Sequence, residues 1–232
     1  MTEFDEQPIY AQLARIGKAV ANPVRLRLLD VLDSGERPVD KLADDAGISL
    51  KNTSAQLREL RSAGLVSTRK AGTRIYYSVA DEDVSRFLLG LQDFAYGRLA
   101  DLRDAVSDHV GDPAELEPVT AADLDARLAD PATLVIDVRT ANEYALGHVP
   151  GAISVPMAEL YDQIASLPQD MEIVAYCGGP YCVVSPRAVR LLRENGRRAR
   201  PLDGGLSRWR REGRRMHARP QTGAGTTMVS TS

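Results

Sequence analysis

The chain contains few residues of the kinds that secreted and metal-dependent proteins rely on. Its 232 residues include two cysteines, three histidines and one tryptophan, and aromatic residues make up 5%. The two cysteines lie five positions apart and cannot form the disulfide framework of a small secreted domain. We therefore expect a reducing, cytoplasmic location, where any static disulfide is disfavoured.

Long apolar runs are missing too. No segment approaches the ~20 apolar residues that a membrane span requires, and the first thirty residues lack the pattern of a signal peptide. We therefore expect no membrane partner. The formal net charge of −3 gives the whole chain no attraction for nucleic acid, so a nucleic-acid partner must be argued from local clusters of basic residues.

A polar segment with two prolines and a glycine divides the chain. Residues 107–118 (SDHVGDPAELEP) follow a helical pattern and predict a linker. A length of 232 residues allows two small domains, which we place at 1–106 and 119–215. Residues 216–232 end in QTGAGTTMVSTS, which has no periodicity and predicts a disordered tail.

Before the linker the pattern is mainly helical. Asn22 and Pro23 are typical of a helix start, Gly47 and Gly64 of helix ends, and Ala71-Gly72 of a hairpin turn. The expected elements are helices from Pro23, over 41–46, over 50–63 and over 81–106, and strands over 65–70 and 73–79. This order predicts a winged helix-turn-helix, whose second helix enters the major groove.

The second helix of this pair and the hairpin are basic. Residues 49–74 carry six Lys or Arg against one acid, Glu59, which is a patch able to neutralise phosphates. Side chains in the first turns of the helix can reach base edges, and they are Lys51, Asn52, Thr53, Ser54 and Gln56. A solvated charged helix with a protein-binding wing remains the alternative.

Three separated segments resemble the ArsR family of bacterial repressors. They are LARIGKAVANPVRLRLLD (13–30), LRELRSAGLV (57–66) and GTRIYY (72–77), and the resemblance covers residues 10–105. It implies a homodimer, paired through its first and last helices, that binds a palindromic operator DNA. It also implies base contacts by Asn52, Thr53 and Gln56, and backbone contacts by Lys51, Lys70, Thr73 and Arg74.

Many members of that family sense metal ions, but this chain departs from them. The stretch RPVDKL (37–42) has no cysteine beside the helix pair, and His109 is the one histidine of the first 110 residues. Thiophilic metals need thiolates, and zinc needs several nitrogen or sulfur ligands. We therefore predict no metal site and no cofactor, so the chemical input must enter elsewhere.

After the linker, short apolar strands alternate with helices. Strands are expected over 133–137 and 172–176, and helices over 121–128, 157–167 and 186–195. This alternation predicts an α/β domain with a parallel sheet covered on both faces. Reactive groups in such sheets collect where a strand ends, and Cys177 directly follows the second strand.

The loop VAYCGGPYC (174–182) holds both cysteines. Its backbone N–H groups and the start of the next helix can surround an anion, which lowers the pKa of a cysteine held there. The donors expected are those of Gly178, Gly179, Tyr181, Cys182 and Val183, since Pro180 has none. The alternatives are a buried apolar Cys177, a metal site that lacks two ligands, and a static disulfide.

Two further segments resemble signatures of the rhodanese family. They are IDVRTANEYALGHVPGAISVP (136–156) and LDGGLSRW (202–209), within a resemblance over residues 117–213. It implies that Cys177 takes a sulfane sulfur from thiosulfate, a persulfide or a polysulfide and passes it to a thiol acceptor. Supporting roles are implied for Asp137, Arg139, His148 and Trp209, and a wall for Gly204-Gly205.

Cys182 departs from the rhodanese pattern, which has an arginine at that position. Loss of the cation weakens binding of an anionic donor, whereas a second thiol can attack a Cys177 persulfide, release sulfide and leave a disulfide. We predict a DNA-binding repressor that senses reactive sulfur through Cys177 and Cys182. The alternatives are a sulfurtransferase tethered to a DNA-binding domain, a regulator responsive to an arsenate-like oxyanion, and a Cys182 that only packs.

A second basic cluster lies near the end of the chain. Residues 190–219 carry eleven arginines against three acids. The cluster is either a solvated face or a surface that contacts DNA or attracts anionic sulfur donors.

Overall fold

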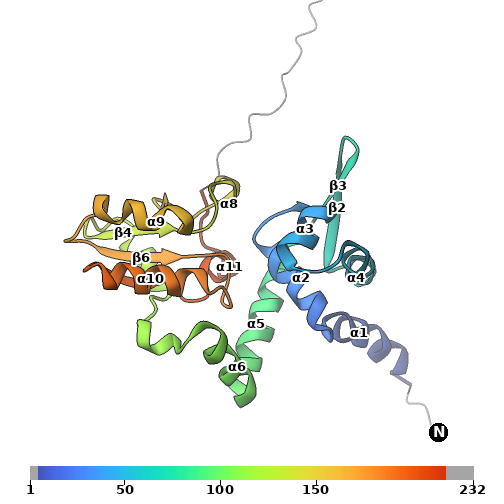
Figure 1. The fold of residues 1–232 in the computed structure, drawn as a ribbon. Helices are drawn as coiled ribbons and strands as arrows, with labels where there is room; N and C mark the ends of the chain where they lie inside the picture. The colour runs from blue at the N-terminus through green and yellow to red at the C-terminus, as the bar shows by residue number, and fades with distance from the viewer. Residues whose placement is uncertain (1–4, 218–232) are drawn as a thin grey trace, which may run out of the picture.

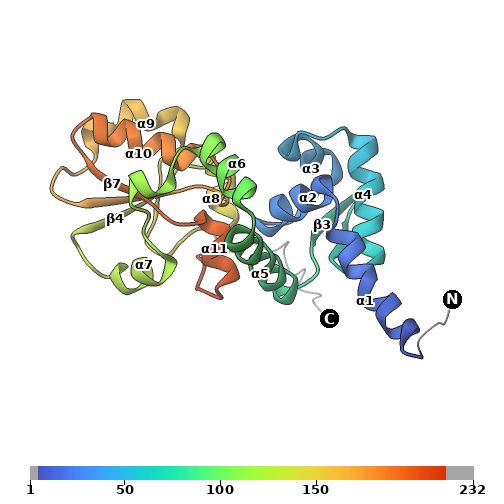
Figure 2. The same ribbon diagram turned by 90° about the horizontal axis from the view of Figure 1, so that it is seen from below.

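The computed structural model describes residues 5–217, and they form two domains that lie side by side (Figures 1 and 2). Residues 218–232, most of the expected tail, lie outside the described residues. Met216 and His217 are described, and His217 pairs with His148 in an antiparallel bridge. Among the described residues, no helix combines the length and the apolar character of a membrane span.

The first domain is helical and carries a small antiparallel sheet of order β1-β3-β2. Its elements are α1 (Gln7–Val20), α2 (Pro23–Asp33), β1 (Arg37–Pro38), α3 (Val39–Ala46), α4 (Leu50–Ser62), β2 (Val66–Ala71), β3 (Arg74–Val79), α5 (Glu82–Arg98) and α6 (Ala100–Val110). The Asn22 side chain caps α2, and α3 stops at Gly47, where φ is +70°. A core of leucines joins α2, α3 and α4, so local signals and the apolar pattern agree in this domain.

The expected helix over 81–106 is wrong in two respects. The backbone at Leu99 is extended, with φ −103° and ψ 111°, and it separates α5 from α6. The second helix then continues to Val110, so residues 107–110 of the expected linker are helical. Gly97, a poor helix former, lies two residues before the break, but an isolated glycine inside a helical pattern is often tolerated and does not by itself predict a helix end.

The second domain is an α/β domain with a parallel sheet of order β5-β4-β6-β7. Its elements are α7 (Ala121–Arg127), β4 (Thr133–Asp137), α8 (Ala141–Leu146), β5 (Ile153–Ser154), α9 (Met157–Gln163), β6 (Glu172–Tyr176), α10 (Val184–Glu194), β7 (Arg198–Pro201) and α11 (Gly205–Arg211), with 3₁₀ turns at Pro113–Leu116 and Ile164–Ser166. The two strands predicted from sequence, β4 and β6, lie at the centre of the sheet.

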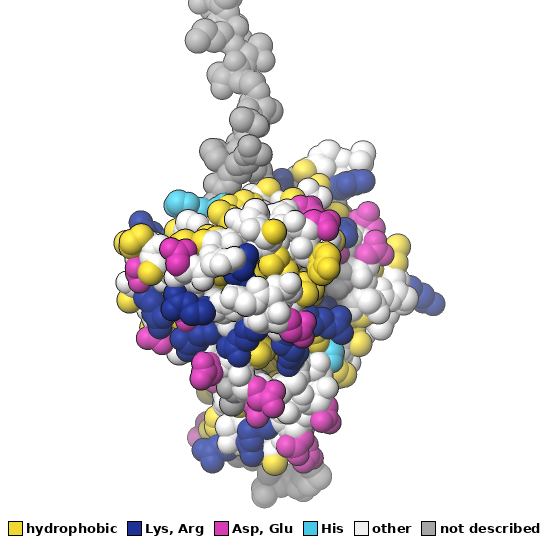
Figure 3. Space-filling model, turned by 60° about the vertical axis from the view of Figure 1, so that its left-hand side comes forward, with side chains coloured by type: hydrophobic (Ala, Val, Ile, Leu, Met, Phe, Trp, Pro, Cys, Tyr) yellow, Lys and Arg dark blue, Asp and Glu magenta, His cyan; other side chains and the backbone are white. Residues whose placement is uncertain are grey.

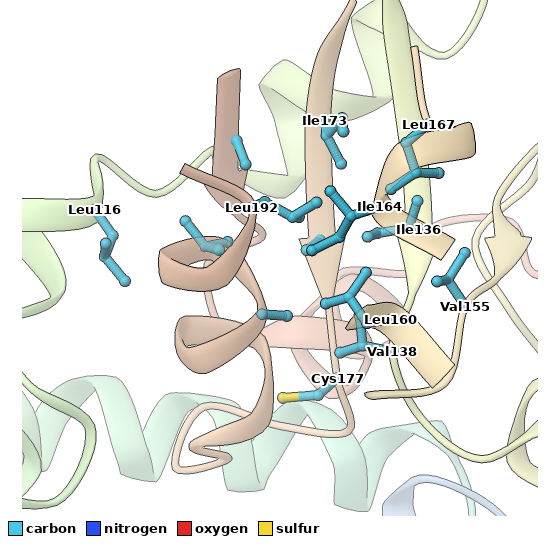
Figure 4. Packing of buried hydrophobic residues seen from close by; sticks show 14 residues of the cluster. Leu116, Ile136, Val138, Val155, Leu160, Ile164, Leu167, Ile173, Cys177 and Leu192 are labelled. Carbon is cyan, nitrogen blue, oxygen red and sulfur yellow. The ribbon is translucent and has the colours of Figure 1, made fainter. Parts of the chain in front are cut away.

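Each face of this sheet has its own apolar core. Ile136, Ile173 and Leu192 belong to the core shared with α9 and α10 (Figure 4), while Val135, Val174 and Trp209 belong to the core on the opposite face. Successive residues of a strand point to opposite faces, which explains why β4 and β6 are continuous apolar runs. Cys177 lies where β6 ends.

Candidate functional site

Cys177 is held in a tight, almost closed setting at the end of β6. Its side chain belongs to the core below α10, it is 1% exposed, and its sulfur points towards that helix (Figure 4). Cys177 Sγ lies 3.3 Å from Ser185 Oγ and 3.7 Å from the carbonyl oxygen of Cys182. The Cys182 carbonyl accepts from the Cys177 thiol and so favours its protonated form, whereas the Ser185 hydroxyl and N–H donate to the sulfur and act in the opposite direction.

Cys182 lies at the far end of the loop and is only half-buried. Its backbone N–H donates to the Gly179 carbonyl at 3.2 Å, which turns the loop back towards β6. The two cysteine side chains share a hydrogen bond, and the backbone N–H groups of Val184, Gly178 and Ser185 are directed at the Cys182 sulfur. The two thiols therefore form a contacting pair that is not bonded as a disulfide.

The pKa values of the two cysteines are shifted in opposite directions. Burial raises the pKa of Cys177 well above its ordinary value, and the neighbouring Cys182 raises it further. The hydrogen bond from Cys177 lowers the pKa of Cys182 to about 6, and the N–H groups of Val184, Gly178 and Ser185 add to this effect against the cost of burial. The cysteine whose pKa the loop lowers is therefore Cys182, and the pKa of Cys177 is raised.

The loop residues that were expected to surround an anion divide into two groups. Gly178 does direct its N–H at a sulfur, together with Val184 and Ser185 of the first turn of α10. Gly179 accepts a hydrogen bond from Cys182 instead. The Tyr181 side chain faces the first domain, where burial and the nearby Asp30 raise its pKa.

Asp137 and Arg139 form a buried ion pair behind the loop. Arg139 Nε lies 3.0 and 3.1 Å from the two Asp137 oxygens, and Arg139 Nη2 also donates to the Gly147 carbonyl at 2.7 Å. His148 stacks on Tyr144 with ring centroids 3.8 Å apart. Asp137 and Arg139 satisfy each other's hydrogen bonds, and His148 Nδ1 lies 3.0 Å from the Tyr144 carbonyl oxygen.

Trp209 and the glycines before it position α11 against the cysteine loop. Trp209 is fully buried in the core and donates from Nε1 to the Arg215 carbonyl at 2.8 Å. Leu206 N–H donates to the Cys177 carbonyl at 2.9 Å. At Gly205 φ is +59°, and a Cβ would lie 2.7 Å from that same carbonyl oxygen. Only glycine allows this close approach.

The C-terminal turn of α11 contacts the first domain. The contacts come from Arg208, Arg210 and Arg211, which reach Asp93 of α5, the Asp33 carbonyl of α2, and Gln92 of α5, respectively. Arg211 Nε also lies 2.8 Å from Asp33 Oδ2 in an ion pair whose two side chains are both buried. One short helix thus links the carbonyl of Cys177 to α2 and α5.

Two cavities meet at Cys182. One of about 590 Å³ is lined by Cys177, Cys182 and the loop, and also by residues of α2, β1 and α3. The other, of about 240 Å³, lies between α5, α6 and the second domain, and Cys182 lines it as well. Cys182 is therefore reachable from the boundary between the domains.

The candidate DNA-contacting residues lie on α4 and on the β2–β3 hairpin. Lys51 and Asn52 are exposed at the start of α4, and Ser54 and Gln56 are half-buried. Gln56 accepts a hydrogen bond from Arg25 and donates to Asn52. Lys70, Thr73 and Arg74 are exposed on the hairpin.

The prediction that Thr53 contacts a base is wrong. Its side chain is fully buried, with no partner for its hydroxyl among the described residues, so it faces the core and cannot reach a base edge. Spacing along the helix placed it among short polar residues, but the packing of α4 on α2 decides its direction.

Both halves of the chain are similar to known protein families. The family model described as "Rhodanese-like domain" matches residues 120–212, and "Helix-turn-helix domain" matches residues 20–69. The HTH-type transcriptional regulator Rv0324 of Mycobacterium tuberculosis is 46% identical over 202 residues, which are 87% of this chain and 88% of that protein. The chain belongs to the HTH-type transcriptional regulators, with an ArsR-type DNA-binding domain and a rhodanese-like domain.

Other similarities cover one domain at a time. The regulator NmtR of M. tuberculosis is 42% identical over 78 residues, or 34% of this chain and 65% of that protein. The solution structure of the homodimeric winged helix-turn-helix domain of Mb0332 from Mycobacterium bovis is 42% identical, with a TM-score of 0.40, and covers 44% of this chain and 94% of that chain. Within residues 5–217 of this regulator, no three His, Cys, Asp or Glu side chains gather as a metal-binding group.

The second basic cluster of this regulator is largely bound within its own domains. Figure 3 shows Lys and Arg side chains in a band across the rhodanese-like domain. Arg193, Arg197 and Arg198 donate to backbone carbonyls of that domain, and Arg211 is buried against the DNA-binding domain. These arginines stabilise loops and the domain boundary, a role that sequence alone did not suggest.

Proposed function

We propose that operator binding by this regulator responds to sulfane sulfur through the thiol pair Cys177 and Cys182. The observation that carries the proposal is the hydrogen-bonded pair, one thiol fully buried and one half-buried, at the boundary with the DNA-binding domain. Both cysteines of the chain take part in the proposed reaction, and a sulfur donor can reach Cys182 from the larger cavity. A low pKa and partial exposure are the properties of a reactive cysteine.

The chemistry follows from which sulfur is ionised. The Cys182 thiolate attacks the outer sulfur of a donor, the donor's sulfur bond breaks with its electron pair on the leaving group, and a Cys182 persulfide forms. Cys177 then bonds to Cys182 Sγ. The S–S bond of the persulfide breaks and its outer sulfur leaves as HS⁻ with the electron pair, the Cys177 proton passes to solvent, and a Cys177–Cys182 disulfide remains. The donor is the oxidant, and the order reverses the one implied by the rhodanese resemblance.

Formation of the disulfide changes the hydrogen bonding of the cysteine loop. A bonded Cys182 sulfur is no longer an anion, so the N–H groups of Gly178, Val184 and Ser185 lose a charged acceptor. The same loop is bonded through its carbonyls to α11, and α11 holds α2 and α5 through Arg211. We propose that a change in the loop is transmitted through α11 and alters the placement of the DNA-binding domains. The reduced and disulfide forms would then be the two states that a switch requires.

For DNA binding we propose a cytoplasmic homodimer on a palindromic operator. Exposed apolar side chains on α1 and α5 support pairing through these helices, among them Ile9, Leu13 and Phe94. The proposed DNA contacts come from α4 and the hairpin, and they are Lys51, Asn52, Ser54, Gln56, Lys70, Thr73 and Arg74. Two-fold symmetry of the protein then matches two half-sites about one helical turn apart.

The test combines intact mass with operator affinity on one sample. After one equivalent of a hydropersulfide, the protein is expected to lose about 2 Da, as two thiols become a disulfide, and its operator Kd is expected to change by at least about tenfold. Dithiothreitol should restore both values. A disulfide that forms while operator affinity stays constant would contradict the sensing role.

The same samples distinguish a sensor from a tethered sulfurtransferase. Because the second thiol resolves the persulfide internally, we expect a single equivalent of sulfide and then arrest until a reductant is added. Sustained turnover with thiosulfate and a thiol acceptor, without accumulation of the disulfide, supports the enzyme instead.

The reaction rate should follow ionisation of Cys182. With its pKa near 6, the thiolate fraction falls as pH falls, so alkylation of Cys182 at pH 5 is expected to be about tenfold slower than at pH 7. Replacing Cys177 with alanine removes the hydrogen bond that is the largest cause of the low pKa, and the midpoint should move up towards the ordinary value for cysteine. Peptide mapping of iodoacetamide-labelled protein measures both profiles; an unchanged midpoint in Cys177→Ala would contradict the assignment.

A further inference from the structure

The larger cavity is built jointly by the two domains. It has a volume of about 590 Å³, which is in the usual range for small-molecule sites. The rhodanese-like domain contributes Cys177, Cys182 and Glu143, and the DNA-binding domain contributes Arg27 and Asp30. A molecule bound beside the thiol pair therefore touches both domains at once.

Three arginines line this cavity, and two of them are committed to partners. Arg139 is buried against Asp137. Arg37 is buried and bonded to Asp45 and to the carbonyls of Val31 and Gly35.

Arg27 is different, because its side chain is 51% exposed. Its Nη1 lies 3.5 Å from Asp30 Oδ2, and its Nη2 donates to the Asp45 carbonyl at a long 3.3 Å. Cys182 occupies the loop position at which the rhodanese pattern has an arginine. Arg27, on α2 of the DNA-binding domain, supplies a cation to the same cavity from outside the rhodanese-like domain.

Glu143 offers a negative group across the cavity. Its Oε2 accepts from the Thr140 hydroxyl at 2.7 Å and from the Thr140 N–H at 3.2 Å in the capping box of α8. Its Oε1 has one neighbour among the cavity's charged groups, Arg37 Nη2, at 3.9 Å. Oε1 can therefore accept a hydrogen bond from a bound cation.

We propose that this cavity is the donor site and that it selects a zwitterionic organic persulfide, with Arg27 binding the carboxylate and Glu143 binding the ammonium group. The inference rests on the proposed function. An inorganic dianion such as thiosulfate fills little of this volume and meets the carboxylates of Asp30, Asp45 and Glu143. In the reaction, R–S–SH gives its outer sulfur to the Cys182 thiolate, and R–S⁻ leaves with the electron pair of the broken S–S bond.

The experiment measures disulfide formation by intact mass with four donors and the full-length protein. The donors are the hydropersulfides of cysteine, mercaptoacetate and cysteamine, and thiosulfate. The wild-type protein is expected to react at least about tenfold faster with cysteine hydropersulfide than with thiosulfate. Arg27→Gln should slow the two organic donors that carry a carboxylate by about tenfold and leave the cysteamine donor unchanged.

Glu143→Gln should show the opposite pattern, slowing the two donors that carry an amine, and glutamine keeps the capping box. Arg86→Gln is the matched control, because Arg86 is an exposed arginine on α5 that pairs with Asp83 and does not line the cavity. The donor that each variant leaves unaffected shows that the variant is folded.

The possible outcomes separate the two proposals. If the wild-type protein forms the disulfide but neither variant distinguishes the donors, or thiosulfate reacts as fast as cysteine hydropersulfide, the donor assignment is overturned and the sensing proposal stands. If no donor yields the disulfide in the wild-type protein, the sensing proposal itself fails.

Discussion

Cys182→Ser is expected to reduce the rate of reaction with a persulfide donor by at least about a hundredfold. The substitution removes the thiolate whose pKa is about 6, and the remaining Cys177 is 1% exposed with a raised pKa. A protonated, buried thiol is a poor nucleophile. Stopped reactions analysed by intact mass measure the loss, and operator affinity should become independent of the donor.

Cys177→Ser should have a different result. The Cys182 thiolate still attacks the donor, but no second thiol resolves the product, so a persulfide with about 32 Da of added mass is expected to accumulate. Serine preserves a hydrogen-bond donor next to Cys182. If the added sulfur is instead found in Cys182→Ser and absent in Cys177→Ser, Cys177 is the first acceptor and the order proposed above is wrong.

Arg211→Met is expected to destabilise the protein by about 3–5 kcal/mol, the usual cost of removing one partner from a buried ion pair. Asp33 is fully buried and is held by Arg211 of α11 and by the Ser85 hydroxyl of α5 at 2.5 Å. Methionine keeps much of the arginine volume, so the loss reports the uncompensated carboxylate rather than a cavity. Urea unfolding followed by circular dichroism measures the change.

The matched control is Arg215→Met, four residues further along the chain. The Arg215 side chain is exposed, and only its backbone carbonyl accepts a hydrogen bond, from Trp209 Nε1. Its expected effect is within about 0.5 kcal/mol. Arg211→Met should also weaken the link between the thiol pair and the operator, so that disulfide formation proceeds while operator affinity changes less than in the wild-type protein. If the two variants had equal free energies of unfolding, the Arg211–Asp33 ion pair would not be a stabilising contact between the domains.

Local signals in the sequence were sufficient where neighbouring residues decide the outcome. Asn22 caps α2, Gly47 ends α3, and the apolar runs at 133–137 and 172–176 are β4 and β6 with the predicted bounds. The helix break at Leu99 was missed because its one local signal is an isolated glycine, Gly97, which a helix can tolerate. Thr53 was misplaced because its burial depends on how α4 packs against α2, and its helix position alone is compatible with either face.

The candidate site shows the same division. The sequence alone determined that the chain has two domains, that both cysteines lie in one glycine-containing loop after a buried strand, and that an arginine expected at Cys182 is absent. The tertiary structure decided which thiol ionises, because burial and the direction of N–H groups from α10 act on Cys182 and not equally on Cys177. It also decided that Arg27 lines the same cavity as the thiol pair and that Arg211 of α11 pairs with Asp33 of α2, since both arrangements bring together parts of different domains that meet only after each domain has folded.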